Sequence, residues 1–154
     1  MTIFLLILHG LLAVALLGAI THQAIAAWIP AGQPADSFAT RARSVSAPAY
    51  TGAIVVLYLL TMALGAFIYA EYRVSIRIVL EQLEVRAVNG SFELKEHFAA
   101  IGLGMLPAYW FYWRRPLNPG HARIRAALTL VLAFIVWWAF LVGHVVNNIR
   151  GFEA

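Results

Sequence analysis

Histidines are the residues of this 154-residue chain whose type and position point most directly to chemistry. His9 and His144 lie inside long apolar segments near the two ends of the chain, and His97 opens a third such segment. Imidazole holds haem iron, binds divalent metal ions and exchanges protons near neutral pH. The chain has no cysteine, which excludes disulfides, thiolate nucleophiles, iron–sulfur clusters and cysteine zinc sites. The histidines therefore point to a haem or a metal ion.

The composition places these histidines in a membrane. Apolar residues make up 62% of the chain and charged residues 12%, with a mean hydropathy of +0.79. A typical soluble domain is about 45–50% apolar and about 25% charged. A chain of this size cannot bury so much apolar surface, so a soluble enzyme, a disordered tail and a secreted disulfide scaffold are excluded. The net charge of +4 does not indicate nucleic-acid binding, because there is no soluble face to carry it.

The chain reads as one membrane domain over residues 1–154 with four spans. A helix crosses the hydrocarbon core with about 20 apolar residues, and lipid-exposed open strands are excluded because their backbone groups would stay unpaired. The predicted spans are residues 3–28, 51–72, 96–113 and 125–148. We therefore expect an all-α polytopic membrane protein, an antiparallel four-transmembrane-helix bundle embedded in a lipid bilayer.

The sequence of the middle connection predicts an amphipathic helix that either lies on the membrane or extends the second span outward. Over residues 76–87, apolar side chains recur at helical spacing opposite charged ones. Asn89 and Gly90 are expected to stop this helix, and Ser91 to serve as the N-cap of the third span. A further short helix is expected after Asp36 in the first loop.

Three histidines converge if four spans alternate in direction. His9 lies about 9 Å of helix rise inside the first span from Ile3. His144 lies six residues before Arg150, at the matching depth of the last span, and His97 lies nearer the surface. Polar side chains within spans point inward, because leaving them in lipid is costly. We therefore expect these imidazoles to face one another at a single end of the bundle.

The first hypothesis for this cluster is haem b. His9 and His144 would be the axial ligands, from the first and fourth spans. Small residues near His97 (Ala100 and Gly104, with Ile101 on the same face) would leave room for a flat group. The haem propionates would need cations, and the candidates are Arg73, Arg77 and Arg150.

Two other hypotheses stay open. A metal ion such as zinc, iron, manganese or copper would take imidazole and carboxylate ligands. The candidates are His9, His97, His144 and Glu93, the last lying one helical turn before His97. Alternatively, the histidines only hydrogen-bond across helices, and the chain is a cofactor-free accessory subunit of a larger membrane complex.

Two stretches carry a resemblance. The opening LHGLLAVALLG and the ending FLVGHVVNNIRG resemble the first and last helices of small four-helix b-type membrane cytochromes and of copper-resistance-D-like membrane domains. Those families place histidines near the exoplasmic ends of their helices, and they exchange electrons with quinones or handle copper. The resemblance implies His9 and His144 as axial haem ligands, and a quinone or an exoplasmic redox protein as partner.

Charge gives an orientation. The short turn of residues 114–125 is basic and flanks two spans directly, where the positive-inside rule has most weight. We expect this turn to be cytoplasmic and both termini to be exoplasmic, in a bacterial inner membrane. With almost no extramembrane domain, the chain is expected to be an electron-transfer or non-catalytic subunit beside other membrane subunits rather than a stand-alone enzyme.

Overall fold

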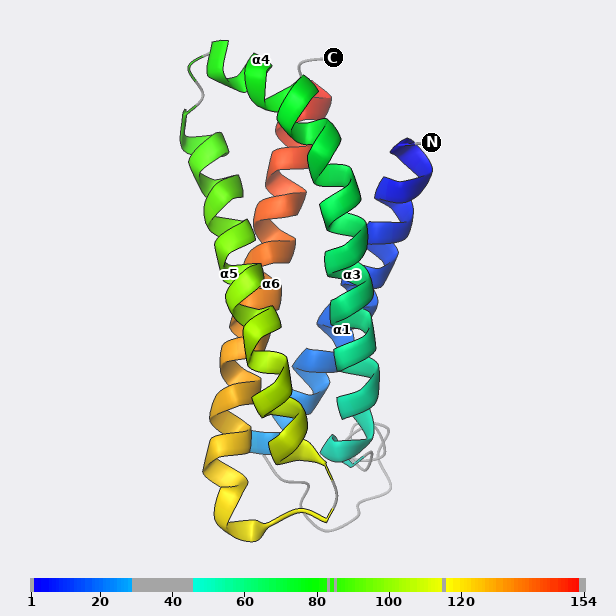
Figure 1. The fold of residues 1–154 in the computed structure, drawn as a ribbon, viewed down its shortest axis with the longest axis vertical. Coiled ribbons are helices and arrows are strands. Elements are labelled where there is room, and N and C mark those ends of the chain that lie inside the picture. Colours follow the sequence, from blue (N-terminus) through cyan, green and yellow to red (C-terminus); the bar gives the residue numbers. More distant parts are fainter. Residues whose placement is uncertain (1, 29–45, 83, 85, 115, 153–154) are drawn as a thin grey trace.

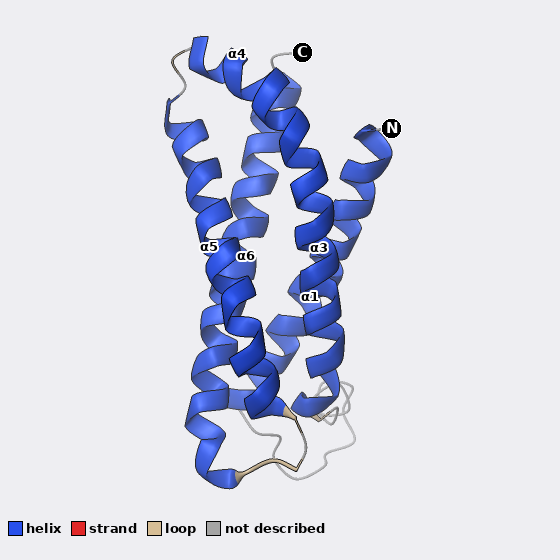
Figure 2. Ribbon diagram, in the orientation of Figure 1, coloured by secondary structure: helices blue, strands red, loops and turns tan. Residues whose placement is uncertain are grey.

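The structure is a computed structural model that describes residues 2–28, 46–82, 84, 86–114 and 116–152. Over these residues every regular element is a helix and there is no strand (Figure 2). The prediction of an all-α chain is confirmed. The short helix expected after Asp36 lies outside the described residues, as does the side chain of Arg150.

Four long helices lie side by side in alternating directions (Figure 1). They are α1 (Thr2–Trp28), α3 (Thr51–Glu71), α5 (Arg86–Trp113) and α6 (Ala122–Phe152). Short 3-10 turns, Ala47–Tyr50 and Pro119–His121, lead into α3 and α6. Helix α1 packs against α3 and α6, and α5 packs against α6 and, less extensively, α3. Both chain termini lie at one end, here called the terminal end, and Trp28, Thr51, Trp113 and Ala122 mark the opposite loop end.

The connection at the terminal end extends the second helix, which is one of the two predicted arrangements, but it is shorter than expected. Helix α3 continues through a π-helical turn, Tyr72–Ile76, into the short helix α4 (Arg77–Gln82). The chain then reverses at Glu84, whose φ of 57° is left-handed. The amphipathic segment expected over residues 76–87 is therefore shorter, and it is a bent extension of α3.

The expected helix stop at Asn89 and Gly90 is wrong, and so is Ser91 as an N-cap, because α5 already begins at Arg86. The Asn89 side chain does not cap a helix. It accepts a hydrogen bond from the Tyr72 hydroxyl (2.7 Å) and donates one to Glu81 (3.4 Å). These contacts from the preceding helix satisfy the amide, which removes its usual preference for a turn.

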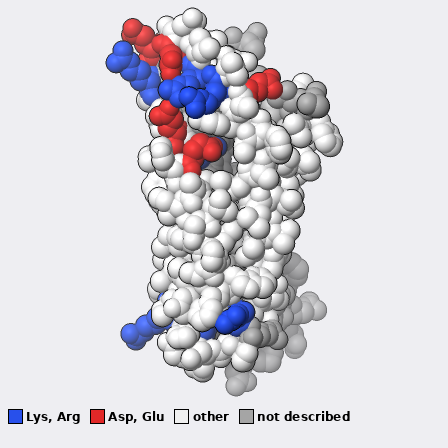
Figure 3. All heavy atoms as spheres, viewed as in Figure 1, with Lys and Arg blue, Asp and Glu red and all other residues white. Residues whose placement is uncertain are grey.

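Three helical segments of the described chain are long and apolar enough to cross a membrane: Ile3–Trp28, Ala47–Gln82 and Pro119–Val146. Helix α5 is not among them: its first half carries Glu93, Lys95 and Glu96, and its second half contains Pro107 and several tyrosines and tryptophans. Figure 3 shows the charged side chains of the visible face gathered at the two ends, with an uncharged belt between them. The chain is therefore helical with three candidate spans, and the predicted fourth span is not confirmed.

The buried core lies toward the loop end. Its members come from all four helices and include Ile20, Ile54, Tyr109 and Leu132. At its centre Gln23 is fully buried and forms hydrogen bonds in both directions. Its amide nitrogen donates to Ala47 O (3.0 Å) and Thr51 Oγ1 (3.2 Å), and its amide oxygen accepts from the Tyr109 hydroxyl (2.5 Å). This network joins α1, the start of α3 and α5.

Two further hydrogen bonds tie α6 into the same end. Trp113 on α5 donates to the hydroxyl of Thr129 (2.9 Å), and Trp28 on α1 donates to the carbonyl of Ala126 (3.2 Å). Thr129 is fully buried, so its bond to Trp113 is made in an apolar setting. All four helices are thus fixed to one another at the loop end.

Tyr58 marks where the tight packing stops. Its ring belongs to the buried core, and its hydroxyl crosses from α3 to donate to the Ala99 carbonyl of α5 (2.8 Å). The crossing is possible because residue 102 is glycine: a Cβ there would collide with the Tyr58 hydroxyl.

We expect Gly102→Ala to destabilise the protein by about 1–3 kcal/mol, because the added methyl displaces a buried tyrosine from its hydrogen bond. The measurement is thermal unfolding of detergent-purified protein followed by circular dichroism. Gly104→Ala is the matched control, since a Cβ at Gly104 meets nothing within 4 Å. Equal melting temperatures for the two variants would contradict the role assigned to Gly102.

Candidate functional site

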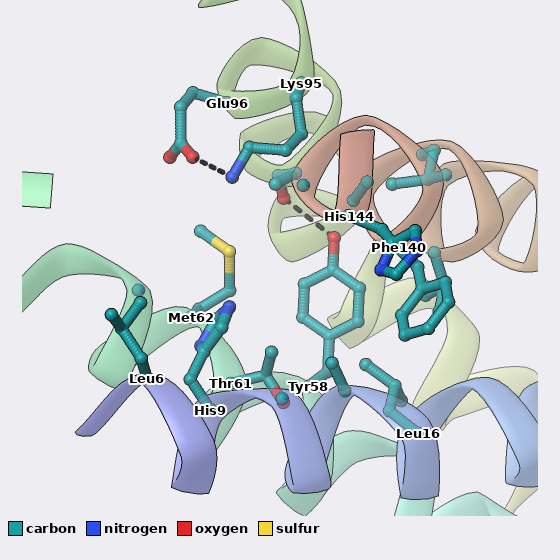
Figure 4. A pocket seen from close by; sticks show the side chains of 18 residues that line it. Leu6, His9, Leu16, Tyr58, Thr61, Met62, Lys95, Glu96, Phe140 and His144 are labelled. Atoms are coloured by element: carbon teal, nitrogen blue, oxygen red, sulfur yellow. Dashed lines mark hydrogen bonds and ion pairs between the residues drawn. The ribbon is translucent and has the colours of Figure 1, made fainter. Parts of the chain in front are cut away.

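A cavity of about 290 Å³ opens above Tyr58, in the half of the molecule toward the terminal end. All four long helices line it, with His9 from α1, Met62 from α3, Lys95 from α5 and His144 from α6 (Figure 4). A second cavity of about 140 Å³ adjoins it toward α4 and shares His9, Lys95 and Glu96 in its lining. Together the two reach the size at which proteins hold small ligands, about 300–1,000 Å³.

His9 is a partly buried polar residue of this cavity. Its ring packs against α3 where residue 65 is glycine, and a Cβ there would lie 3.3 Å from His9 Cε1. His9 Nδ1 is buried and makes no hydrogen bond within the described chain, and the same holds for Thr61 Oγ1, which lines the same cavity. Buried polar atoms in proteins are nearly always hydrogen-bonded. Water or a polar ligand in the cavity would supply partners for these two atoms.

His144 lines the cavity from α6, on the other side of Tyr58 from His9 in the view of Figure 4. Its ring lies parallel to that of Phe140, with centroids 6.4 Å apart and an interplanar angle of 4°. The Asn148 amide donates to His144 Nε2 (3.0 Å). A nitrogen that accepts a hydrogen bond offers the lone pair that a metal ion needs. The pair is exposed, so replacing Asn148 with another partner costs little.

Lys95 and Glu96 place two charges on the cavity wall, and neither is among the site residues predicted from the sequence. Lys95 Nζ lies 2.7 Å from Glu96 Oε1 and 4.2 Å from the centre of the Phe92 ring. A signal for Lys95 does exist in the sequence. It begins the series Lys95, Ala99, Gly102, Leu106, Tyr109, whose helical spacing defines the face of α5 that packs against the other helices.

The prediction that His97 points into the bundle is wrong. His97 is exposed and lines neither cavity, and its Nδ1 donates to the Glu93 carbonyl (2.8 Å). Its neighbours Ala100, Ile101 and Gly104 point outward with it, and Ile101 is 54% exposed. These residues form no slot for a ligand.

The expected propionate partners also lie elsewhere. Arg73 is exposed, with its guanidinium carbon 6.0 Å from the centre of the Tyr69 ring. Arg77 forms ion pairs with Glu81 (2.7 Å) and with Glu93 (2.9 Å). Neither arginine lines either cavity.

The metal hypothesis finds no cluster to support it. Within the described residues, no group of three or more histidine and carboxylate side chains lies close enough to hold a metal ion. The two other histidines lie at the loop end, His22 stacked on Tyr50 (4.7 Å) and His121 edge-on to Tyr112 (5.1 Å). The site is thus a cavity with one imidazole on α1, one on α6 and a lysine–glutamate pair on α5.

No known protein family, curated protein or solved structure matches this chain.

We expect a cysteine at position 99 to react with a small water-soluble maleimide and a cysteine at position 100 not to react. Ala99 lines the cavity beside Lys95 and Glu96, whose charges favour water there, whereas Ala100 is exposed on the outer face, which lipid would cover if α5 crosses the membrane. The chain has no native cysteine, so each of Ala99→Cys and Ala100→Cys reports one position. The measurement is the labelled fraction, by mass spectrometry, of protein in lipid nanodiscs. Faster labelling at position 100 would place the cavity on the wrong side of α5.

Proposed function

We propose that this protein is an integral membrane electron carrier that holds haem b in the cavity between α1 and α6, with His9 and His144 as axial ligands. One observation carries the proposal: two imidazoles from different helices line one mostly apolar cavity, and His9 Nδ1 is buried there without a hydrogen bond. Haem requires axial imidazoles on separate helices and a mostly apolar slot.

The proposal takes α5 as a fourth membrane span. Its outward side chains are large and apolar, and Ile101, Trp110 and Phe111 are each about half exposed (54%, 48% and 50%). Exposed apolar side chains on this scale are stable in lipid but not in water. The charges that lower the hydropathy of α5 lie in its first half, toward the terminal end, where lipid headgroups and water are near.

The lining residues suit a large flat group. Gly10, Gly65 and Gly143 remove side chains from three of the cavity walls, and Phe140 offers an aromatic surface parallel to the His144 ring. His144 would exchange its exposed hydrogen bond from Asn148 for iron, and His9 has no described hydrogen bond at Nδ1 to give up. Bound haem supplies reversible one-electron transfer.

The cavity lies toward the terminal end, which the charge pattern orients to the exoplasmic side. An electron donor or acceptor would therefore be a membrane quinone or a redox protein on that side. The apolar outer faces of α1 and α3, which include Ile7, Leu11 and Phe67, suit lipid or neighbouring membrane subunits.

The test is the visible spectrum of detergent-purified protein, oxidised and dithionite-reduced. We expect a Soret band and sharp reduced α and β bands, which indicate haem with two strong axial ligands. His9→Ala and His144→Ala should each lose the sharp α band, because one imidazole is removed. His97→Ala is the matched control and should keep the wild-type spectrum, since His97 lies outside the cavity.

A featureless spectrum from wild-type protein supplied with haem would end this proposal. An unchanged α band in both His9→Ala and His144→Ala would assign the iron to other ligands, and it would equally overturn the site.

A further inference from the structure

We propose that Lys95 is the anion-binding group of the cavity and that it takes a carboxylate of the bound porphyrin in place of its present partner, Glu96. The inference rests on the proposed function for its ligand. It assigns to α5 the role that the sequence had suggested for Arg73, Arg77 and Arg150.

Lys95 is paired with Glu96, which occupies the adjacent position of the same helix. Side chains at adjacent positions of a helix point in directions about 100° apart and do not face each other. Lys95 and Glu96 nevertheless meet at 2.7 Å, at the edge of both cavities. The ammonium is therefore paired with a carboxylate that projects in a different direction from α5, and a carboxylate arriving inside the cavity would offer it a partner on the cavity side.

The two partners also differ in exposure. The Lys95 side chain is 15% exposed and that of Glu96 is 36% exposed. Glu96 can therefore recover much of its hydration when the ion pair breaks. Lys95 is less exposed and needs an anion close to its present position. The Phe92 ring, 4.2 Å from Lys95 Nζ, holds the ammonium at the cavity edge without neutralising it.

The ligand that fits this arrangement has a large apolar body and a carboxylate at one edge. The body would fill the larger cavity between His9 and His144, and the carboxylate would reach Lys95, where the two cavities join. The nearby arginines are committed elsewhere, because Arg77 already holds two glutamates and Arg73 lines neither cavity.

The experiment measures binding of iron-free protoporphyrin IX to the purified full chain by fluorescence and absorbance titration. This porphyrin carries the carboxylates of haem but no iron, so its affinity does not depend on axial ligation. We expect Lys95→Met to weaken it at least about tenfold, the effect of losing one charge-assisted contact, and Lys95→Arg to restore most of the affinity. Glu96→Gln should tighten binding, because it removes the competing anion.

Two controls separate a charge contact from a general disturbance of the fold. Arg73→Met removes a cation from the same end of the molecule and should leave the affinity unchanged. The dimethyl ester of protoporphyrin IX has no free carboxylate, so wild type and Lys95→Met should bind it equally. A merely structural role for Lys95 and Glu96 would make both Lys95→Met and Glu96→Gln weaken binding, which overturns the inference.

The two proposals fail in different ways. If protoporphyrin IX binds with the expected dependence on Lys95 but haem gives no α band, haem ligation fails and the carboxylate site stands. If haem gives the α band and Lys95→Met changes neither titration, the Lys95 assignment fails and the axial ligands stand. If wild type binds neither porphyrin, both proposals are overturned.

Discussion

The structure depends on one fully buried amide, that of Gln23. In an apolar interior each unpaired donor or acceptor costs free energy that no solvent can return. Gln23 meets this constraint by bonding to Ala47 in the 3-10 turn before α3, to Thr51 at the start of α3 and to Tyr109 on α5. Since these partners have few alternative contacts in lipid, the loop end has one well-defined packing. At the terminal end, the described residues form no hydrogen bond to the buried atoms His9 Nδ1 and Thr61 Oγ1. The molecule is thus closed at one end and holds its cavities toward the other.

Tyr58 sets the boundary between these halves. Its hydroxyl must find a partner because the ring is buried, and the Ala99 carbonyl of α5 is the one it meets. This bond holds α3 and α5 together at the depth of Gly102. Toward the terminal end, several residues that line the cavity are glycines, at positions 10, 65 and 143. Because these positions lack side chains, a cavity remains between the helices. The cavity is therefore a consequence of the change from large core residues, up to Tyr58, to small residues toward the terminal end.

Hydropathy predicted the three most apolar helices and the all-α class, but not which face of α5 is inside. Lipid tails are as apolar as a leucine side chain, so a residue such as Ile101 is as stable outside as in the core. The outer face of α5 is therefore as apolar as its inner face, and the position of His97 was read as interior. What marks the inner face is size and polarity at helical spacing, with Ala99 and Gly102 small and Tyr109 and Trp113 bonded through their polar atoms. The start of α5 was missed for another reason, since the contacts of Asn89 come from Tyr72 and Glu81 and are not visible in local sequence.

Counting residues from the ends of the spans predicts that His9 and His144 lie at one depth. In the structure both side chains line one cavity. That cavity lies in the half of the molecule that the Gln23 network does not hold closed. A buried ring nitrogen without a hydrogen bond is destabilising, and His9 Nδ1 can remain so because the Gln23 network fixes the helices to one another at the loop end without it. A ligand that joined α1 to α6 through these two side chains would supply the cross-link that the terminal end lacks. Occupancy and stability would then be coupled, because a group that binds only the folded state shifts the folding equilibrium toward it. The terminal end, which holds the cavity, is thus also the part of the fold that a bound ligand would stabilise most.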